Sequence, residues 1–143
     1  MKELTLALLM WIGSHTPLAY EETPLPSVAT ASQEQLTELR FHGDAPEGYD
    51  MDTGSTVGVY LFEERRIYLW DNYDFTTVEG KAALVHELVH YLQYEHGLHE
   101  TVDCTAQLEL TAYNAEAEYL KQHGREPNFT GMDIVLASMC WDA

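Results

Sequence analysis

The chain has 143 residues, of which 45% are hydrophobic, and its 24 acidic and 7 basic side chains give a formal net charge of −17. This length and apolar content suit one folded domain with a single core, and they exclude a disordered chain. Because phosphate backbones and anionic lipid surfaces repel such a charge, the composition argues against nucleic acids and anionic membranes as partners and favours metal ions or cationic partners.

Residues 1–31 have the composition of a secretory signal peptide followed by a linker. Lys2 provides a positive start, and residues 4–12 form an apolar run of signal-peptide length. This run is too short to cross a bilayer, so we expect no stable membrane insertion. Residues 20–31 are rich in Pro, Thr and Ser, which predicts a linker. We therefore expect a mature domain of residues 32–143 that is exported to the periplasm or the extracellular space.

The first part of this domain is predicted to contain a helix, a loop and a hairpin. The segment from Ser32, a favourable N-cap residue, to Arg40 predicts a short helix. Residues 42–55 include three Gly, a Pro and several Asp, which is typical of a loop. Residues 56–62 and 67–70 are enriched in β-branched and aromatic side chains and flank a polar turn, which predicts a β-hairpin.

The next helix carries the most informative pattern of the chain. It is expected to begin near Thr76 or Thr77, either of which can cap it, and to end at Gly97. An H-E-x-x-H motif occupies residues 86–90, in a window that is apolar nearly all round and therefore typical of a buried helix. Buried histidines and glutamates are costly unless they are paired or bound to metal. The alternative is two hydrogen-bonded core histidines with a solvated glutamate.

The motif His86-Glu87-Leu88-Val89-His90 has the spacing of a zinc site. Residues four positions apart lie about 6 Å apart along a helix and on one face, so both imidazoles can reach one metal ion. Glu87 lies one step round the helix, where it can contact a water on that metal without being a ligand. This arrangement predicts a metallopeptidase that hydrolyses a peptide or protein substrate with Zn²⁺ as cofactor and Glu87 as general base.

A second helix is predicted from Asp103, as its N-cap, to His123, with Gly124 just beyond its end. A catalytic zinc site usually has three protein ligands. Glu109 is the preferred third ligand, because two antiparallel helices joined by a short loop can bring it opposite the histidines. Glu116 lies seven positions further on nearly the same stripe and competes for this role. It can instead accept a hydrogen bond from a ligand histidine.

Other polar side chains near the motif are weaker candidates for a role in the metal site. The metzincin pattern H-E-x-x-H-x-x-G-x-x-H would make His96 a ligand, but Gln93 replaces the glycine at which that chain turns, so His96 is carried away on the helix. Gln93 itself lies seven residues after the first histidine, where it can hydrogen-bond to a ligand. Tyr113, Tyr94 and His99 are candidates to stabilise an oxyanion.

The C-terminal part is predicted to contain a third helix over residues 132–139, and it carries one of the two cysteines. In an exported protein, Cys104 and Cys140 are most simply one disulfide. Two buried free thiols are the alternative. The absence of a C-x-x-C motif from the sequence argues against a structural cysteine-zinc site.

Residues 86–93 together with residues 109–113 resemble the gluzincin metallopeptidases, most closely the compact minigluzincin type and small bacterial metallopeptidases with an H-E-x-x-H…E-x-x-A pattern. The likeness covers residues 56–123. It implies an α+β, zincin-like fold in which a small antiparallel sheet packs on the motif helix and on a glutamate-bearing helix. It also implies that residues 67–70 form an edge strand that holds substrate by strand addition. The implied metal ligands are His86, His90 and Glu109, with Glu87 as the base.

The chain departs from the larger gluzincins in two ways. They place an aspartate four residues after the ligand glutamate, where this chain has Tyr113, and they have a second lobe that this short chain lacks, so we expect shallow substrate binding. Two other functions stay open: a non-catalytic metal-binding or regulatory protein that keeps a zincin fold, and a lytic enzyme that acts on peptide cross-links. An intact Glu87 favours an enzyme, because a purely structural site needs no base.

Overall fold

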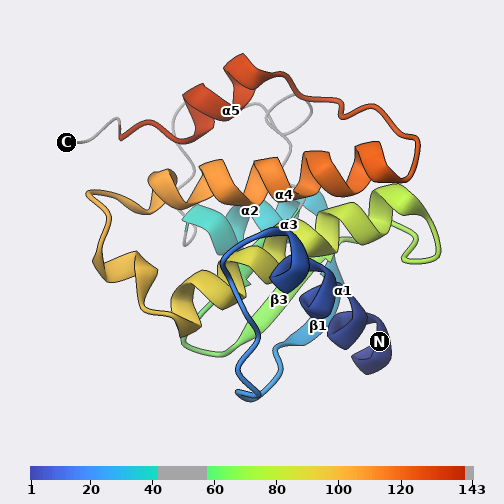
Figure 1. Cartoon of the computed structure of the whole chain (residues 1–143), viewed down its shortest axis with the longest axis horizontal. Coiled ribbons are helices and arrows are strands. Elements are labelled where there is room, and N and C mark those ends of the chain that lie inside the picture. Colours follow the sequence, from blue (N-terminus) through green and yellow to red (C-terminus); the bar gives the residue numbers. More distant parts are fainter. Residues whose placement is uncertain (42–57, 141–143) are drawn as a thin grey trace.

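The structure is a computed structural model that describes residues 1–41 and 58–140. It confirms the α+β class, with helices packed around a small sheet (Figure 1). The predicted loop at 42–55 and the first two residues of the predicted hairpin, 56 and 57, lie outside the described residues. The elements in chain order are α1 (Lys2–His15), β1 (Ser27–Ala31), α2 (Gln33–Phe41), β2 (Gly58–Leu61), β3 (Arg66–Trp70), α3 (Val78–Glu95), the 3₁₀ turns η1 (Leu98–Glu100) and η2 (Thr105–Leu108), α4 (Glu109–Gln122) and α5 (Gly131–Ala137).

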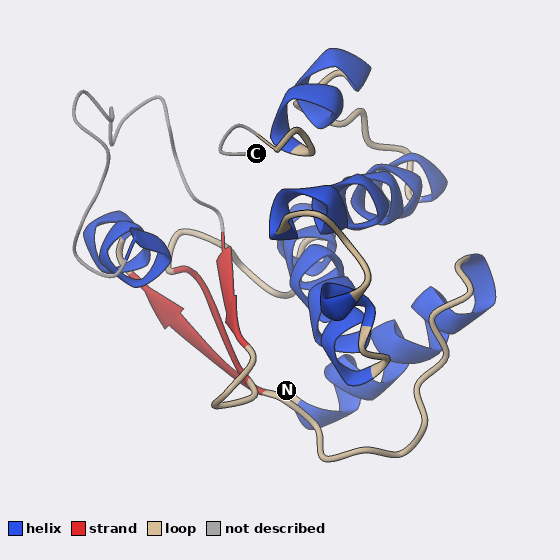
Figure 2. Ribbon diagram, turned by 90° about the vertical axis from the view of Figure 1, so that its left-hand side faces the viewer, coloured by secondary structure: helices blue, strands red, loops and turns tan. Residues whose placement is uncertain are grey.

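The sheet has the strand order β1-β3-β2 and is mixed. Strands β2 and β3 form the predicted antiparallel hairpin, whereas β1 pairs with β3 in parallel, from Ser27 opposite Arg66 to Ala31 opposite Trp70. Helix α2 covers one face of this sheet and α3 covers the other (Figure 2).

Two sequence predictions about this sheet are wrong. Residues 27–31, expected within a linker, form the edge strand β1, and residues 67–70, expected at an edge, lie in the central strand β3. Both errors have one cause. The hydrogen-bonding partner of β1 lies almost forty residues away in the chain, and a local reading of a Pro-rich segment cannot detect such pairing.

Helix α3 is the centre of the fold, and its predicted limits are confirmed. The hydroxyl of Thr77 accepts a hydrogen bond from the Gly80 amide at 3.1 Å, and the helix ends before Gly97, whose φ of 74° is the left-handed conformation typical of a residue after a helix. Every residue from 82 to 93 is buried. The sheet lies against one side of α3, while α1 and α4 pack on the others.

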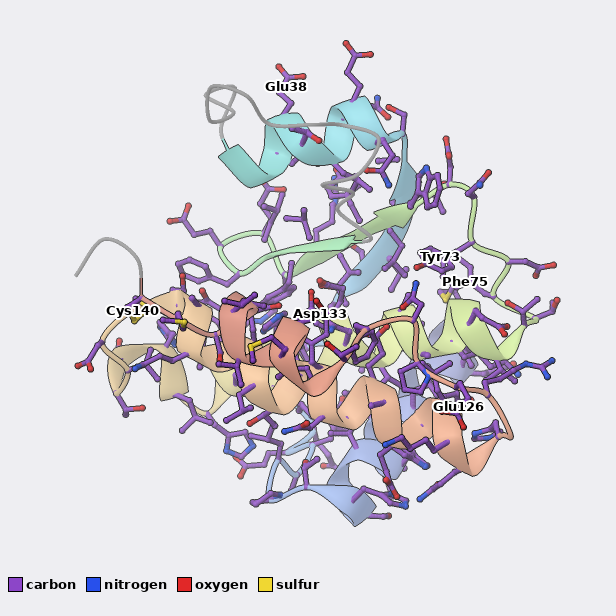
Figure 3. The ribbon with its side chains drawn as sticks, turned by 90° about the horizontal axis from the view of Figure 1, so that it is seen from above. Glu38, Tyr73, Phe75, Glu126, Asp133 and Cys140 are labelled. Carbon is purple, nitrogen blue, oxygen red and sulfur yellow. A yellow bond between two sulfur atoms is a disulfide. The ribbon has the colours of Figure 1, made fainter. Side chains whose placement is uncertain are left out.

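Helix α4 begins later than the sequence predicts. Asp103 does not cap it. Cys104 is extended, residues 105–108 form the turn η2, and α4 starts at Glu109. Cys104 is held there by a disulfide with Cys140, the predicted pairing, which joins the start of η2 to the segment after α5 (Figure 3). An extended, cross-linked Cys104 prevents the chain from entering a helix at Asp103.

The N-terminal segment packs on the same core. Leu8, Leu9 and Ile12 of α1 are buried in it, and the hydroxyl of Tyr91 donates to the carbonyl oxygen of Pro24 at 2.8 Å. No helix within residues 1–41 and 58–140 combines the length and the apolar character needed to cross a bilayer. The assignment of residues 1–31 to a signal peptide and linker, with the domain over residues 32–143, stays a prediction.

Two shorter helices lie close to their predicted positions. The hydroxyl of Ser32 accepts a hydrogen bond from the Gln35 amide at 3.2 Å at the start of α2. At the start of α5, Thr130 and Asp133 form a reciprocal capping box. Helix α5 then packs on α4.

Replacing both Cys104 and Cys140 by serine should lower the free energy of unfolding by about 2–4 kcal/mol, because the disulfide restricts the unfolded chain. The two cysteines are 36 positions apart, so the closed loop is long. Urea denaturation followed by circular dichroism measures the change. The reduced wild-type protein should behave like the double variant, and an unchanged unfolding free energy in both would contradict the prediction.

Stability should fall as the pH rises from about 10 to about 12. Burial raises the pKa of Tyr73 to about 12, and burial together with the charge of Glu95 raises the pKa of Tyr60. Above pH 10 the unfolded chain therefore binds fewer protons than the folded chain, which lowers the free energy of unfolding. Denaturation at pH 8 and pH 11 tests this, and the variants Tyr60→Phe and Tyr73→Phe should each lose less stability at pH 11 than the wild type.

Candidate metal centre

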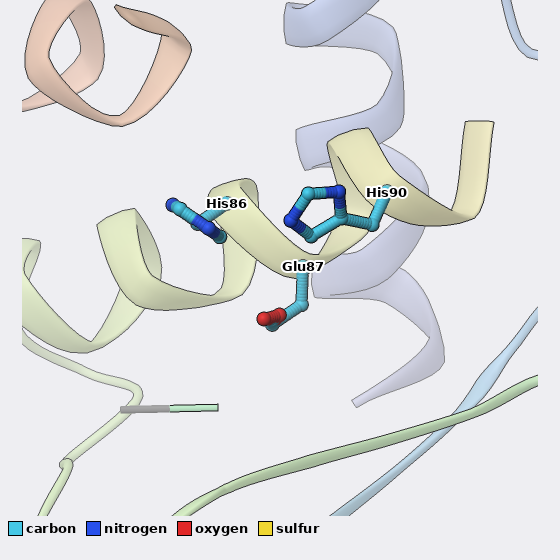
Figure 4. A group of neighbouring side chains, drawn as sticks. All are labelled: His86, Glu87 and His90. Atoms are coloured by element: carbon cyan, nitrogen blue, oxygen red, sulfur yellow. The ribbon is translucent and has the colours of Figure 1, made fainter. Parts of the chain in front are cut away.

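The side chains of the H-E-x-x-H motif lie together on α3 and are all buried. One ligand atom from each of His86, Glu87 and His90 lies within 4.8 Å of the others. Figure 4 shows the two imidazoles side by side on α3, with the Glu87 carboxylate leaving the helix in a different direction. The three side chains therefore lie close enough together to share one metal ion, although the acid leaves the helix in its own direction.

Helix α4 brings Glu109 to both histidines. One oxygen of its carboxylate lies 3.2 Å from Nε2 of His86, and the other contacts Nε2 of His90. The close approach of the two helices is possible because Ala112 and Ala115, on the inner face of α4, are small and buried. The predicted third ligand thus faces the two imidazoles from the first residue of α4.

The other ring nitrogen of each histidine, Nδ1, also has a hydrogen-bond partner. Nδ1 of His86 lies 2.8 Å from an oxygen of Glu116, and Nδ1 of His90 lies 2.8 Å from the side-chain oxygen of Gln93. The amide nitrogen of Gln93 donates to the carbonyl oxygen of Leu108 at 2.9 Å, which fixes the direction of its oxygen. Both partners of Nδ1 are acceptors, so each Nδ1 carries a proton, and whenever a ring is neutral the lone pair of its Nε2 points toward Glu109.

Two lone pairs and a carboxylate in one buried space repel each other unless a positive charge lies between them. Burial acts to lower the pKa of His86, but hydrogen bonds with Glu109 and Glu116 outweigh it and raise this pKa well above its ordinary value. Burial acts to raise the pKa of Glu109, but hydrogen bonds with His86 and His90 hold it far below its ordinary value. The site therefore stabilises positive charge, as extra protons or as a metal ion, and its two nitrogens and one carboxylate suit a divalent metal.

The Glu87 side chain approaches strand β2. Its Oε2 is buried and has no hydrogen-bond partner among the described side chains and backbone, and burial raises its pKa. Strand β2 approaches it closely at Gly58, where a Cβ atom would lie 2.9 Å from Cγ of Glu87 and 2.7 Å from Cδ2 of Leu69. Any larger residue at this position would have to displace the side chains of Glu87 and Leu69.

Sequence reasoning missed Gly58 and the Leu108 carbonyl. An isolated glycine within a predicted strand is a recognised sign of close backbone approach, so Gly58 carried a signal that pointed to it. A backbone carbonyl that orients a side chain has no such signal, because every residue has one.

The three oxyanion candidates lie at different distances from the cluster of ligands. The ring of Tyr113 packs edge-on against His86, with centroids 4.5 Å apart. Burial and the charge of Glu109 raise the pKa of Tyr94. His99 stacks on Tyr94 at 4.4 Å, one layer further out. Tyr113 is therefore the candidate in direct contact with a histidine of the motif.

His96, the third ligand that a metzincin pattern would require, lies apart from the other histidines. It follows the last residue of α3, and its Nε2 lies 2.8 Å from the carbonyl oxygen of Ala19. Its place agrees with the sequence argument that the helix continues past Gln93.

Comparison with known proteins gives one match. The family model described as DUF6647, a domain of unknown function, matches residues 1–143. No curated protein and no solved structure matches the chain.

Replacing Glu116 by glutamine should weaken metal binding by about tenfold, because a neutral amide holds the Nδ1 proton of His86 less strongly than a carboxylate does. Competition for Zn²⁺ with a chromogenic chelator measures the affinity. Glu118→Gln is a matched control, since Glu118 is an exposed acid on the same helix. Equal affinities of the two variants would show that Glu116 does not orient a ligand.

Proposed function

This chain belongs to the DUF6647 family, and we propose that it is a zinc-dependent peptidase in which His86, His90 and Glu109 bind the metal ion. The main support for a catalytic function is the position of Glu87. Its buried, unpartnered Oε2 lies beside the ligand cluster but on the side of strand β2. A structural metal site has no use for a buried carboxylate that is kept without a partner, whereas hydrolysis needs a proton acceptor in that place.

The donor set supports zinc. Two histidine nitrogens and one glutamate form one of the known ligand sets of catalytic zinc, which keeps a further position open for water or substrate. When bound, zinc lowers the pKa of its water toward neutrality and polarises the carbonyl group of the substrate. Glu116 and Gln93 hold the two imidazoles in the orientation that this set requires.

The residues of this chain would then divide the chemistry between them. Glu87 takes the proton of the attacking water and passes it to the nitrogen of the leaving amine, so that the peptide bond breaks. Tyr113, whose ring packs on His86, would stabilise charge on the carbonyl oxygen.

Strand β2 is the proposed site of substrate pairing. It pairs with β3 along one edge, and in the part of the chain that the structure describes no strand pairs with its other edge. Because β2 passes directly by Glu87 at Gly58, an extended peptide added along it would carry a peptide bond past the base.

Export from the cytoplasm is part of this proposal. A disulfide between Cys104 and Cys140 is the form of these cysteines that an oxidising compartment such as the periplasm or the extracellular space preserves.

The variant Glu87→Gln should keep its zinc and lose at least about a hundredfold in peptide hydrolysis, because it removes the base without touching a ligand. Zinc content by elemental analysis and cleavage of a peptide library by mass spectrometry test the two halves. His86→Ala should lose both zinc and activity. If Glu87→Gln is as active as the wild type, the role of Glu87 is wrong. If the wild type binds zinc and cleaves nothing, the non-catalytic metal-binding alternative is favoured.

A further inference from the structure

Three rings, Phe62, Tyr94 and His99, form an aromatic cluster in which Phe62 is exposed and the other two are partly buried. The centroids of Phe62 and Tyr94 are 4.6 Å apart, those of Tyr94 and His99 are 4.4 Å apart, and those of Phe62 and His99 are 5.7 Å apart. Phe62 stacks on Tyr94 with an interplanar angle of 15°, so one of its faces is covered, yet 47% of the residue is exposed. About half of Phe62 is therefore open to solvent.

The aromatic cluster lies at the far end of the surface that begins at Glu87. On α3, Tyr94 is two turns after Glu87 on nearly the same stripe, about 10 Å along the axis. Phe62 directly follows the last residue of β2, four residues after Gly58 and about 13 Å along the strand direction. An extended peptide that follows β2 from the base therefore reaches the cluster within about three or four residues.

The surroundings of the aromatic cluster are acidic. An acidic residue follows each ring in the sequence: Glu63 after Phe62, Glu95 after Tyr94, and Glu100 after His99. Glu63 is exposed, and the Glu100 side chain is 80% exposed.

This surface already holds one guanidinium group. Nε of Arg65 pairs with a carboxylate oxygen of Glu95 at 2.5 Å. An arginine side chain of this chain is therefore already bound by the acid that follows Tyr94.

We propose that the aromatic cluster is a subsite that binds a cationic side chain, arginine or lysine, of a peptide held along β2. A cation against the exposed part of the Phe62 ring is attracted by the ring quadrupole where it meets a ring face, and the exposed carboxylates add charge attraction. An apolar side chain would bury the same ring and leave the carboxylates without a counter-charge. As a specificity site, this subsite rests on the proposed peptidase function, and it gives that function a substrate class: peptides with a basic residue three or four positions from the cleaved bond.

The test is peptide binding to the Glu87→Gln protein, which should hold a peptide without cleaving it. The probes are blocked pentapeptides that are identical except for one residue, which is arginine, its neutral isostere citrulline, or leucine. Titration followed by NMR of the aromatic side chains gives the affinity and the site together. We expect the arginine peptide to bind about fivefold more tightly than the citrulline peptide, with the largest shifts at Phe62 and Tyr94.

Three variants of the Glu87→Gln protein locate the preference. Phe62→Leu keeps an apolar side chain but removes the ring, and it should reduce the preference for arginine to less than about twofold. The double change Glu63→Gln and Glu100→Gln should reduce it without altering the packed rings. Met132→Ala, at an exposed apolar residue on α5, should leave it unchanged.

Equal binding of the arginine and citrulline peptides overturns the proposal, as does a preference that persists in Phe62→Leu. Because these measurements require no hydrolysis, their failure is distinct from failure of the peptidase function, which the wild-type protein tests with the peptide library. In a wild-type enzyme that cleaves, the arginine peptide should also be cleaved about fivefold faster at limiting substrate than the citrulline peptide.

Discussion

Helix α3 buries a stripe of polar side chains in the middle of the core, and the elements around it supply hydrogen-bond partners to these side chains. His86, His90 and Gln93 cannot reach water in quantity, so each of their polar atoms needs a protein partner or a metal ion. Helix α4 supplies Glu109 and Glu116, and the turn before it supplies the carbonyl oxygen of Leu108. The alanines of α4 matter for the same reason, because a larger side chain would hold these partners out of range.

Glu87, on the same helix, is not paired in this way. It meets strand β2 where the strand has no side chain, and its Oε2 is left without a hydrogen bond. A buried carboxylate without a hydrogen-bond partner destabilises the fold, and such groups are typically found where they have a function. One helix thus brings two paired histidines and one unpaired acid into a single site, because the histidines are four residues apart and the acid follows the first of them.

The net charge of the chain fits the same picture. A surface with 24 acidic and 7 basic residues repels anions in general, and it gathers cations at the places where carboxylates lie close together. Inside the core this tendency appears as a site that stabilises positive charge between two helices. On the surface beside it, acidic residues flank a partly exposed aromatic ring, at the distance that a few residues of extended peptide span from the base.

Much of the fold and of the candidate site was determined by the sequence alone. The limits of α3 and the hairpin of β2 and β3 follow from local periodicity and capping residues. The count of two cysteines favoured the disulfide over two free thiols, and an expected antiparallel packing of two helices favoured Glu109 over Glu116 as the partner of the H-E-x-x-H motif. Only the tertiary structure decided that residues 27–31 are a strand, that β3 is central, that α4 begins at Glu109, and that Gly58 touches Glu87. These features depend on backbone pairing and cross-links between distant parts of the chain, and the energy of such contacts is absent from any short window of residues.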